Sequence, residues 1–324
     1  MSVQKKAPLA VVAIGGNALI DDQDHQGLGD QARAVARAAA ALVDLTVRGW
    51  RVVVTHGNGP QVGFILRRSE IASREVPVVP MDYATADTQG AIGSMFYRAL
   101  CNEFRYRGLD RKAVALVTHV LVDPADPAFG APDKPVGTFY PQQVALDLAR
   151  RLGWTVAEDS GRGWRRVVPS PRPIAILEAE DIAYLAEGSR VVVACGGGGI
   201  PVVQDPQGLL RGVEAVVDKD RTSALLARSL GAEAFLLCTG VDTVFTGWGT
   251  QAQRRLSTAT AAQARALFGA GEFKAGSMGP KVEAALSYLE GVAGSPSRAV
   301  IGRLEHLAAL IEGTNGTTIQ GDTK

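Results

Sequence analysis

The sequence predicts an α/β protein, a three-layer α/β/α sandwich whose central sheet is mostly parallel. Short, continuously apolar segments alternate with helical segments along much of the 324-residue chain. This alternation is typical of a parallel sheet covered by helices on both faces. Apolar residues make up 46% of the chain and aromatic residues only 6%. Such an Ala-, Val- and Gly-rich composition favours close packing of helices on a sheet.

In the first 122 residues, predicted strands, glycine turns and helices follow one another in a repeating order. A strand over 9–14 is continuously apolar and ends at a Gly-Gly-Asn turn, and a second strand over 51–54 ends at a His-Gly-Asn-Gly turn. Apolar residues at helical spacing follow each turn. Helices are therefore expected over 30–48, 61–70 and 88–107, and a β-rich run over 113–122.

The amino-acid composition changes between residues 123 and 168, where Pro, Asp and Gly recur. A helix over 142–151 and a hairpin within 154–173 are expected there. We interpret 123–168 as a protruding subdomain inserted into one domain that spans 1–324, lying as a lid over the ligand edge of the sheet. Alternating strands and helices are expected again in the second half of the chain. The expected strands cover 191–195, 234–238 and 299–301, and the expected helices cover 218–230, 279–290 and, last, 304–312.

Composition argues against several classes of partner. The net charge of +1 gives no broad field for nucleic acid or an anionic membrane. Three widely spaced cysteines suggest neither a disulfide framework nor a Cys-x-x-Cys zinc site. The polar N-terminus lacks the apolar core of a secretory signal, and no apolar run reaches the length of a membrane span. A cytoplasmic protein is expected.

Three glycine-rich turns follow apolar strands and predict an anion site. They contain Gly15 and Gly16, Gly57 and Gly59, and the run 196–199. Ligands of open parallel sheets gather where strands end, and glycine lets backbone N–H groups approach an anion closely. Each turn alone is equally explained as a tight turn, but three together predict a phosphate-binding floor. The Walker A pattern is absent.

Charged residues near these turns favour phosphoryl transfer over simple binding. Lys219 and Asp220 open a helix soon after the third turn. Lys281 lies in the first turn of another helix, where a cation is unfavourable unless an anion binds there. Lysines in such places neutralise charge on a transferring phosphoryl group. Lys134 taken alone is an ordinary loop lysine, and His56 is either a turn residue or a hydrogen-bond donor at the site.

Taken together, these motifs closely resemble those of the carbamate kinases within the amino-acid kinase family. The similar stretches cover nearly the whole chain in family order. They lie at 13–19, 55–63, 134–137, 167–171, 194–201, 212–220 and 276–285. The His-Gly-Asn-Gly-Pro and Ser-Met-Gly-Pro-Lys runs are specific to this group. The resemblance implies the amino-acid kinase fold and reversible transfer of the ATP γ-phosphoryl group to carbamate, giving carbamoyl phosphate and ADP, often run toward ATP.

The resemblance also implies roles for particular residues. Lys134, Lys219, Asp220 and Lys281 would be catalytic, with Lys134 closing over the phosphate. Gly15, Gly16, Asn17, His56, Gly57, Asn58 and Gly59 would hold the substrate and its phosphate. Gly197, Gly198, Thr239, Val241, Asp242, Ser277, Met278 and Gly279 would bind the nucleotide. Mg²⁺ held through nucleotide phosphates, without assigned protein ligands, and a homodimer are further implications.

The chain departs from the family on the nucleoside side. Gly240 replaces the first acid of a Thr-Asp-Val-Asp run, Phe245 stands where Tyr is usual, and 247–251 lacks the usual Gly-x-Pro. The segment 21–29 also differs. Two alternatives therefore stay open beside a carbamate kinase: a kinase for another small carboxylate or carbamoyl-like acid, and a non-catalytic nucleotide-binding protein of the same fold.

Overall fold

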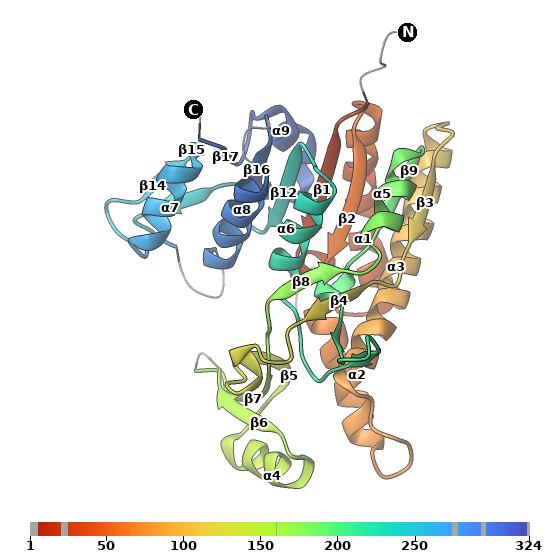
Figure 1. The fold of residues 1–324 in the computed structure, drawn as a ribbon, viewed down its shortest axis with the longest axis vertical. Coiled ribbons are helices and arrows are strands. Elements are labelled where there is room, and N and C mark those ends of the chain that lie inside the picture. Colours follow the sequence, from red (N-terminus) through yellow and green to blue (C-terminus); the bar gives the residue numbers. More distant parts are fainter. Residues whose placement is uncertain (1–5, 21–24, 160, 274–277, 293–295, 323–324) are drawn as a thin grey trace.

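An eight-stranded sheet forms the centre of the protein, in the order β15-β17-β16-β12-β1-β2-β9-β3 (Figure 1). The computed structural model describes residues 6–20, 25–159, 161–273, 278–292 and 296–322. From β16 to β3 neighbouring strands are parallel, whereas β17 pairs antiparallel with β16. The strands are β1 (Leu9–Ile14), β2 (Arg51–His56), β3 (Lys112–Ala115), β9 (Arg190–Val193), β12 (Ala234–Thr239), β15 (Thr258–Thr260), β16 (Arg298–Arg303) and β17 (Thr317–Gln320).

Helices cover both faces of this sheet. One layer contains α1 (Leu28–Val47), α3 (Met81–Tyr106) and α9 (Leu307–Glu312), and the other contains α5 (Ala179–Glu187), α6 (Lys219–Ser229) and α8 (Gly279–Gly291). Every side chain of β1 is buried, and alternate residues serve different cores. Val11 packs with the α5–α6–α8 side and Val12 with the α1–α3–α9 side. Such two-sided burial explains why this strand is continuously apolar.

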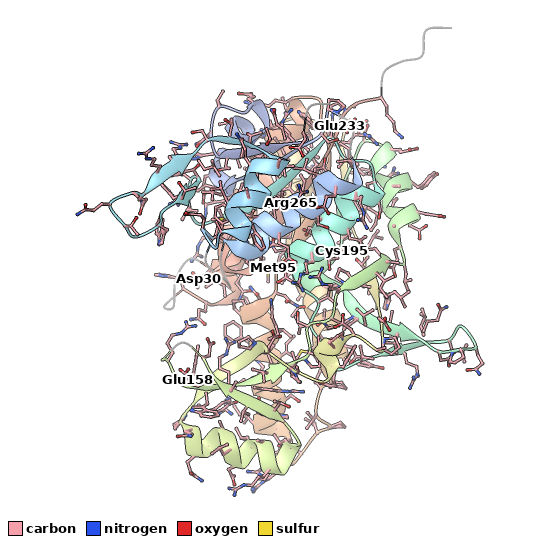
Figure 2. The ribbon with its side chains drawn as sticks, turned by 60° about the vertical axis from the view of Figure 1, so that its left-hand side comes forward. Asp30, Met95, Glu158, Cys195, Glu233 and Arg265 are labelled. Atoms are coloured by element: carbon pink, nitrogen blue, oxygen red, sulfur yellow. The ribbon has the colours of Figure 1, made fainter. Side chains whose placement is uncertain are left out.

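A small sheet protrudes below the body in Figure 1. It has the order β5-β7-β6, formed by Lys134–Tyr140, Trp164–Val168 and Thr155–Glu158, with α4 (Gln142–Leu152) beside it. The β6–β7 pair is the expected hairpin. Figure 2 shows Glu158 in this small sheet and Cys195 in the body above it.

The other elements connect or extend the body. A four-stranded sheet has the order β11-β10-β4-β8, and β13 pairs with β14. These strands are β11 (Leu210–Gly212), β10 (Ile200–Gln204), β4 (His119–Val122), β8 (Pro173–Ile176), β13 (Val244–Thr246) and β14 (Arg254–Leu256). The helices are α2 (Gly59–Ala72), α7 (Ala261–Gly269) and the 3₁₀ turns η1 (Gly16–Leu19), η2 (Pro127–Phe129), η3 (Gly196–Gly198) and η4 (Leu304–His306).

The predicted three-layer class with a mostly parallel sheet is confirmed, with two corrections. The β-rich run 113–122 is not one strand. Its main-sheet pairing ends where Leu116 N donates to Val193 O, after which Thr118 N donates to Gln89 Oε1 and the chain enters the second sheet as β4. The helix over 304–312 is not the last element either, because β17 follows it. Among the described residues, none of the helices is both long and apolar enough to cross a membrane.

Candidate active site

Two glycine turns touch each other at the carboxyl ends of β1 and β2. A Cβ atom on Gly57 would lie 2.5 Å from the backbone N of Gly16, and one on Gly16 would lie 3.2 Å from that of Gly59. A side chain at Gly57 is therefore excluded on steric grounds, and one at Gly16 would be tightly crowded. The two turns pack backbone against backbone, which leaves main-chain groups rather than side chains at the surface of the floor.

The third turn, after β9, is locked onto the second. Cys195 has a φ of 52° and Gly197 a φ of 68°, and a Cβ on Gly197 would lie 2.2 Å from Nδ2 of Asn58. Asn58 Nδ2 in turn donates to Thr88 Oγ1 at 2.8 Å. Gln89 Nε2 donates to Gly196 O at 2.9 Å. Two buried side chains of α3 thus hold two of the glycine turns in one arrangement.

His56 lies behind this floor rather than on it. Its ring is buried, stacks on Phe96 with centroids 5.8 Å apart, and would lie 2.6 Å from a Cβ on Gly196. Burial lowers the pKa of its imidazole to about 4, so it is neutral at physiological pH. Its Nδ1 lies 3.1 Å from Gly57 O, which requires the Nδ1–H tautomer. Of the two roles weighed for His56, the geometry favours support of the turn.

A cavity of about 830 Å³ opens between the floor and the small sheet. Its predicted lining residues come from the second and third turns, from α6 and from β5: Gly57, Asn58, Gly59, Gly197, Lys134, Lys219 and Asp220. Gly15 and Gly16 lie under the turn at Gly57 and are not part of this lining. The backbone of Asn17 belongs to η1.

Three lysines and two aspartates form a network beside the cavity. Lys134 Nζ donates to Asp218 Oδ2 at 2.8 Å, which joins the small sheet to the start of α6. Asp220 lies between two ammonium groups, with Lys219 Nζ 2.7 Å from its Oδ1 and Lys281 Nζ 2.8 Å from its Oδ2. Lys219 Nζ is buried and carries three N–H donors, of which the neighbouring Asp220 oxygen can accept at most one, so this ammonium group keeps unmatched donors.

The lysines control the ionisation of both aspartates. Burial alone would raise the pKa of the Asp220 carboxyl, but the charges of Lys219 and Lys281 outweigh burial and hold its pKa well below the ordinary range. The same two effects act on Asp218: burial alone would raise the pKa of its carboxyl, but the charge of Lys134 outweighs burial and lowers that pKa overall. Both are therefore carboxylates at neutral pH. Three ammonium groups face two carboxylates, which leaves the network positive.

The predicted nucleotide residues separate into groups. Val241 and Met278 line a second cavity of about 290 Å³. Asp242 is exposed and is not part of this lining; it pairs with Arg303 at 2.9 Å and with His306 at 3.5 Å. Gly198 lies against α6, where its carbonyl accepts from Thr222 Oγ1 at 2.8 Å.

Three further residues of this predicted group are placed by sequence position. Thr239 ends β12, and buried Gly279 begins α8. Ser277 lies outside the described residues.

The structure adds residues that sequence reasoning did not assign. Asp218 is the N-cap of α6, where its Oδ1 accepts from Asp220 N at 2.9 Å. An Asp just before a helical pattern is a signal that could have found it. Arg165 lines the larger cavity, donates to Gly137 O at 3.0 Å and to Asp159 at 2.9 Å, and lies over the Phe139 ring. No sequence motif marked Arg165 as a site residue.

This arrangement suits an anion that carries a phosphoryl group. Backbone N–H groups and poorly neutralised ammonium groups offer donors at a water-poor sheet edge, where electrostatic interactions are strengthened. In the described part of the chain, no group of three or more His, Cys, Asp or Glu residues gathers as a metal site. Asp218 and Asp220 are both occupied by lysines, so a cation would need other ligands, such as nucleotide phosphates.

Comparisons with known proteins agree with this geometry. Residues 8–298 match the model of the Amino acid kinase family. A carbamate kinase from Pyrococcus furiosus is 44% identical over 95% of this chain and 98% of that protein. The structure of carbamate kinase from Giardia lamblia bound to AMP-PNP superposes with a TM-score of 0.91, at 36% identity, over 98% of this chain and 100% of that chain. The amino-acid kinase fold expected from the sequence is confirmed.

Proposed function

The chain belongs to the amino acid kinase family, and within it to the carbamate kinases, and on that premise we propose how its own residues carry out phosphoryl transfer. The reaction is transfer of the ATP γ-phosphoryl group to carbamate, giving carbamoyl phosphate and ADP, and its reverse. The single observation that carries the assignment of the site is Lys219, a buried ammonium group with unmatched donors beside the glycine floor.

Positioning and electrostatics supply the catalysis. A carbamate oxygen attacks the γ-phosphorus in line, a P–O bond forms, and the bond to the ADP oxygen breaks. Lys219 and Lys281 offset the charge on the equatorial oxygens, and Asp220 holds both ammonium groups in place. Gly15, Gly16, Asn17, Gly57, Asn58 and Gly59 provide the floor. No covalent intermediate on the enzyme is needed.

The nucleoside occupies the 290 Å³ cavity, so that its phosphates run toward Lys281. Support comes from Met278, which lines that cavity and whose carbonyl accepts from Lys281 N at 3.1 Å. We assign Gly197, Gly198, Thr239 and Gly279 to the same path and keep Ser277 as a predicted nucleotide residue. Asp242 is exposed and paired with Arg303, and it would contact the nucleotide only if that pair broke. Mg²⁺ arrives on the nucleotide phosphates, where it would neutralise charge.

The small sheet acts as a lid. Lys134 lies at the base of the small sheet and forms an ion pair with Asp218 of the body. From this position its ammonium group can move onto the phosphate when the lid closes. Residues 123–168 are the inserted part of a single domain, 1–324. A homodimer in the cytoplasm, with the small-molecule substrates as its ligands, completes the proposal.

A coupled assay with carbamoyl phosphate and ADP tests the assignment. ATP formation is expected from the wild type, and its absence at millimolar substrate would sink the proposal. Lys134→Ala and Lys281→Ala should each lower kcat by about a hundredfold or more, the usual cost of one lost transition-state donor. Lys112→Ala, an exposed lysine of β3, is the matched control.

Two other outcomes are informative. Faster turnover with acetate or another small carboxylate than with carbamate would favour a different acceptor. Tight ADP binding without turnover on any acceptor would favour a non-catalytic nucleotide-binding protein. Near-normal rates in the Lys134 and Lys281 variants would reject the roles given to these residues.

A further inference from the structure

The hairpin β13–β14 carries two of the departures from the family pattern, Phe245 and the segment 247–251. Val244 pairs with Leu256 and Thr246 with Arg254, so the turn between the strands projects Trp248 beyond the sheet. Phe245 and Trp248 form one wall of the 290 Å³ cavity. Their ring centroids are 5.5 Å apart and their planes meet at 55°. Trp248 is 51% exposed, so this large apolar ring is only half covered by the protein.

Glu272 holds this hairpin turn from outside it. Glu272 lies in the loop that follows α7, and its Oε2 accepts from Gly247 N at 2.6 Å. Gly247 has a φ of 59°, and a Cβ there would lie 2.8 Å from Ala252 O. The backbone before Trp248 is thus fixed by a charge-assisted hydrogen bond and by a conformation suited to glycine.

Most other surfaces of the cavity are apolar. Val241, Phe273 and Met278 line it together with two polar side chains. The hydroxyl of Thr243 is already bonded to Thr317 Oγ1 at 2.8 Å, and Glu272 already accepts from Gly247 N through its Oε2. Few polar atoms therefore remain to read the edge of a base. A flat aromatic ligand would be recognised chiefly through its faces, which are the surfaces that aromatic side chains bind best.

We propose that Trp248 is the stacking residue for the nucleobase in this chain, and that Glu272 is a positioning residue that fixes the hairpin turn presenting it. This inference rests on the proposed function, since it requires a nucleoside in the 290 Å³ cavity. Stacking strength grows with ring area, so Trp248 also sets a preference for purine over pyrimidine nucleotides. Phe245, at the edge of the indole, sets its tilt.

Kinetics and calorimetry with ADP and UDP test this inference. Trp248→Ala should raise the KM and the Kd for ADP by about tenfold, the low end of what loss of one base–aromatic stack costs. Its kcat should stay within about twofold, since the interaction is made equally in ground and transition states. The ratio of kcat/KM for ADP over UDP should fall, and Trp248→Phe should restore most of it.

Glu272 is tested by a pair of variants. Glu272→Ala should raise the KM for ADP several-fold, whereas Glu272→Gln, which keeps an oxygen acceptor for Gly247 N, should stay near the wild type. Equal melting temperatures would exclude a general loss of structure. Tyr184→Ala, which removes an exposed aromatic ring on α5, is the control for surface aromatic loss.

The outcomes separate this inference from the proposed function. A Trp248→Ala enzyme with KM and Kd for ADP within twofold of the wild type would overturn the role of Trp248. An equal ADP-to-UDP ratio in wild type and variant would overturn its role in base preference. A wild type that makes no ATP from carbamoyl phosphate would count against the proposed function, while calorimetry with ADP would still decide the role of Trp248.

Discussion

Asp220 is the residue on which the charge balance of the site depends. Its carboxylate is almost wholly buried and touches two ammonium groups, those of Lys219 and Lys281. One lysine would roughly neutralise a buried carboxylate. Two lysines carry one positive charge more than the carboxylate neutralises, and that charge can bind an anionic ligand. The same geometry makes each lysine dependent on Asp220, because without it two like charges would lie side by side in a poorly solvated place.

Asp220→Asn should therefore damage both stability and activity. Removing one partner from a buried ion pair costs about 3 kcal/mol or more, since the other charge is left uncompensated. We expect a loss of that size in the free energy of unfolding, and a kcat/KM lower by about a hundredfold or more. Urea unfolding and the coupled assay measure the two effects. Asp87→Asn, an exposed site on α3, is the control, and an Asp220 variant as stable and active as that control would contradict the prediction.

At the residue scale, local sequence patterns predicted which charged residues would lie together, while their roles stay predictions. Lys219, Asp220 and Lys281 were predicted from glycine turns and helix starts, and the structure brings all three together. Asp218 and Arg165 were not assigned, because partners far along the chain place them at the site; Lys134, for example, lies 84 positions from Asp218. Asp242, which the sequence predicts at the nucleotide, pairs with Arg303, a contact that no local pattern reveals; its role at the nucleotide stays a prediction.

At the scale of elements, the small sheet is attached to the body by polar contacts and by a small apolar cluster. In that cluster Val136 and Val168 pack with side chains of α2 and α3: Val62, Leu66, Met81 and Ala84. Tyr140 OH donates to Glu70 Oε2 at 2.5 Å, which ties the end of β5 to α2. Arg166 of β7 donates to Glu214 Oε2 at 2.8 Å, while Glu214 Oε1 accepts from Met81 N at the start of α3. The polar contacts can break and re-form at little cost, which the proposed closing of the lid would require.

Arg166→Met should loosen the small sheet without unfolding the protein. Glu214 is about half exposed, so the lost pair should change the free energy of unfolding by less than about 1 kcal/mol. Amide hydrogen exchange of residues 134–168 should rise several-fold while exchange in the main sheet stays the same. Arg265→Met, which removes an exposed pair with Glu290, is the matched control. Equal exchange of the small sheet in both variants would show that Arg166 does not fasten it.

Element length decided which strands the sequence could predict. β1, β2, β12 and β16 have six residues each, are almost wholly buried and lie in a parallel sheet, so their apolar runs are unmistakable. β13, β14 and β15 have three residues each and mix exposed and buried side chains. Such segments show no periodicity of their own, and only tertiary pairing makes them strands.

For the whole molecule, the strand order explains why one site collects so many distant segments. β1 lies near the centre of the sheet, with β2 on one side and β12 on the other. The strands that follow β2 and those that follow β12 therefore extend the sheet in opposite directions from β1. The ends of these neighbouring strands open a crevice, as expected at a switch in strand order. The sequence predicted the parallel sheet and therefore a shared edge, but strand order depends on pairings such as β9 between β2 and β3 that no local pattern encodes.

The buried imidazole of His56 predicts how the stability of the whole molecule responds to acid. The unfolded chain takes up a proton at His56 as the pH falls through about 6.5, whereas the folded protein does not until the pH reaches about 4. Between these values the unfolded state binds more protons, so the free energy of unfolding falls with falling pH. The shift corresponds to a loss of about 3 kcal/mol between pH 7 and pH 4 from this one group.

Urea unfolding at pH 7, 6, 5 and 4 measures this loss, and His56→Gln should remove it. The low pKa values of Asp218 and Asp220 do not interfere, because their stabilisation is lost mainly below pH 4 and its loss is common to the wild type and the variant. The difference in slope between wild type and variant therefore isolates His56, whatever the variant's stability at pH 7. Parallel slopes would contradict the prediction, as would an NMR signal of His56 that titrates between pH 5.5 and 7.5 in the folded protein. A flat signal with diverging slopes would mean that the glycine floor depends on an uncharged ring beneath it.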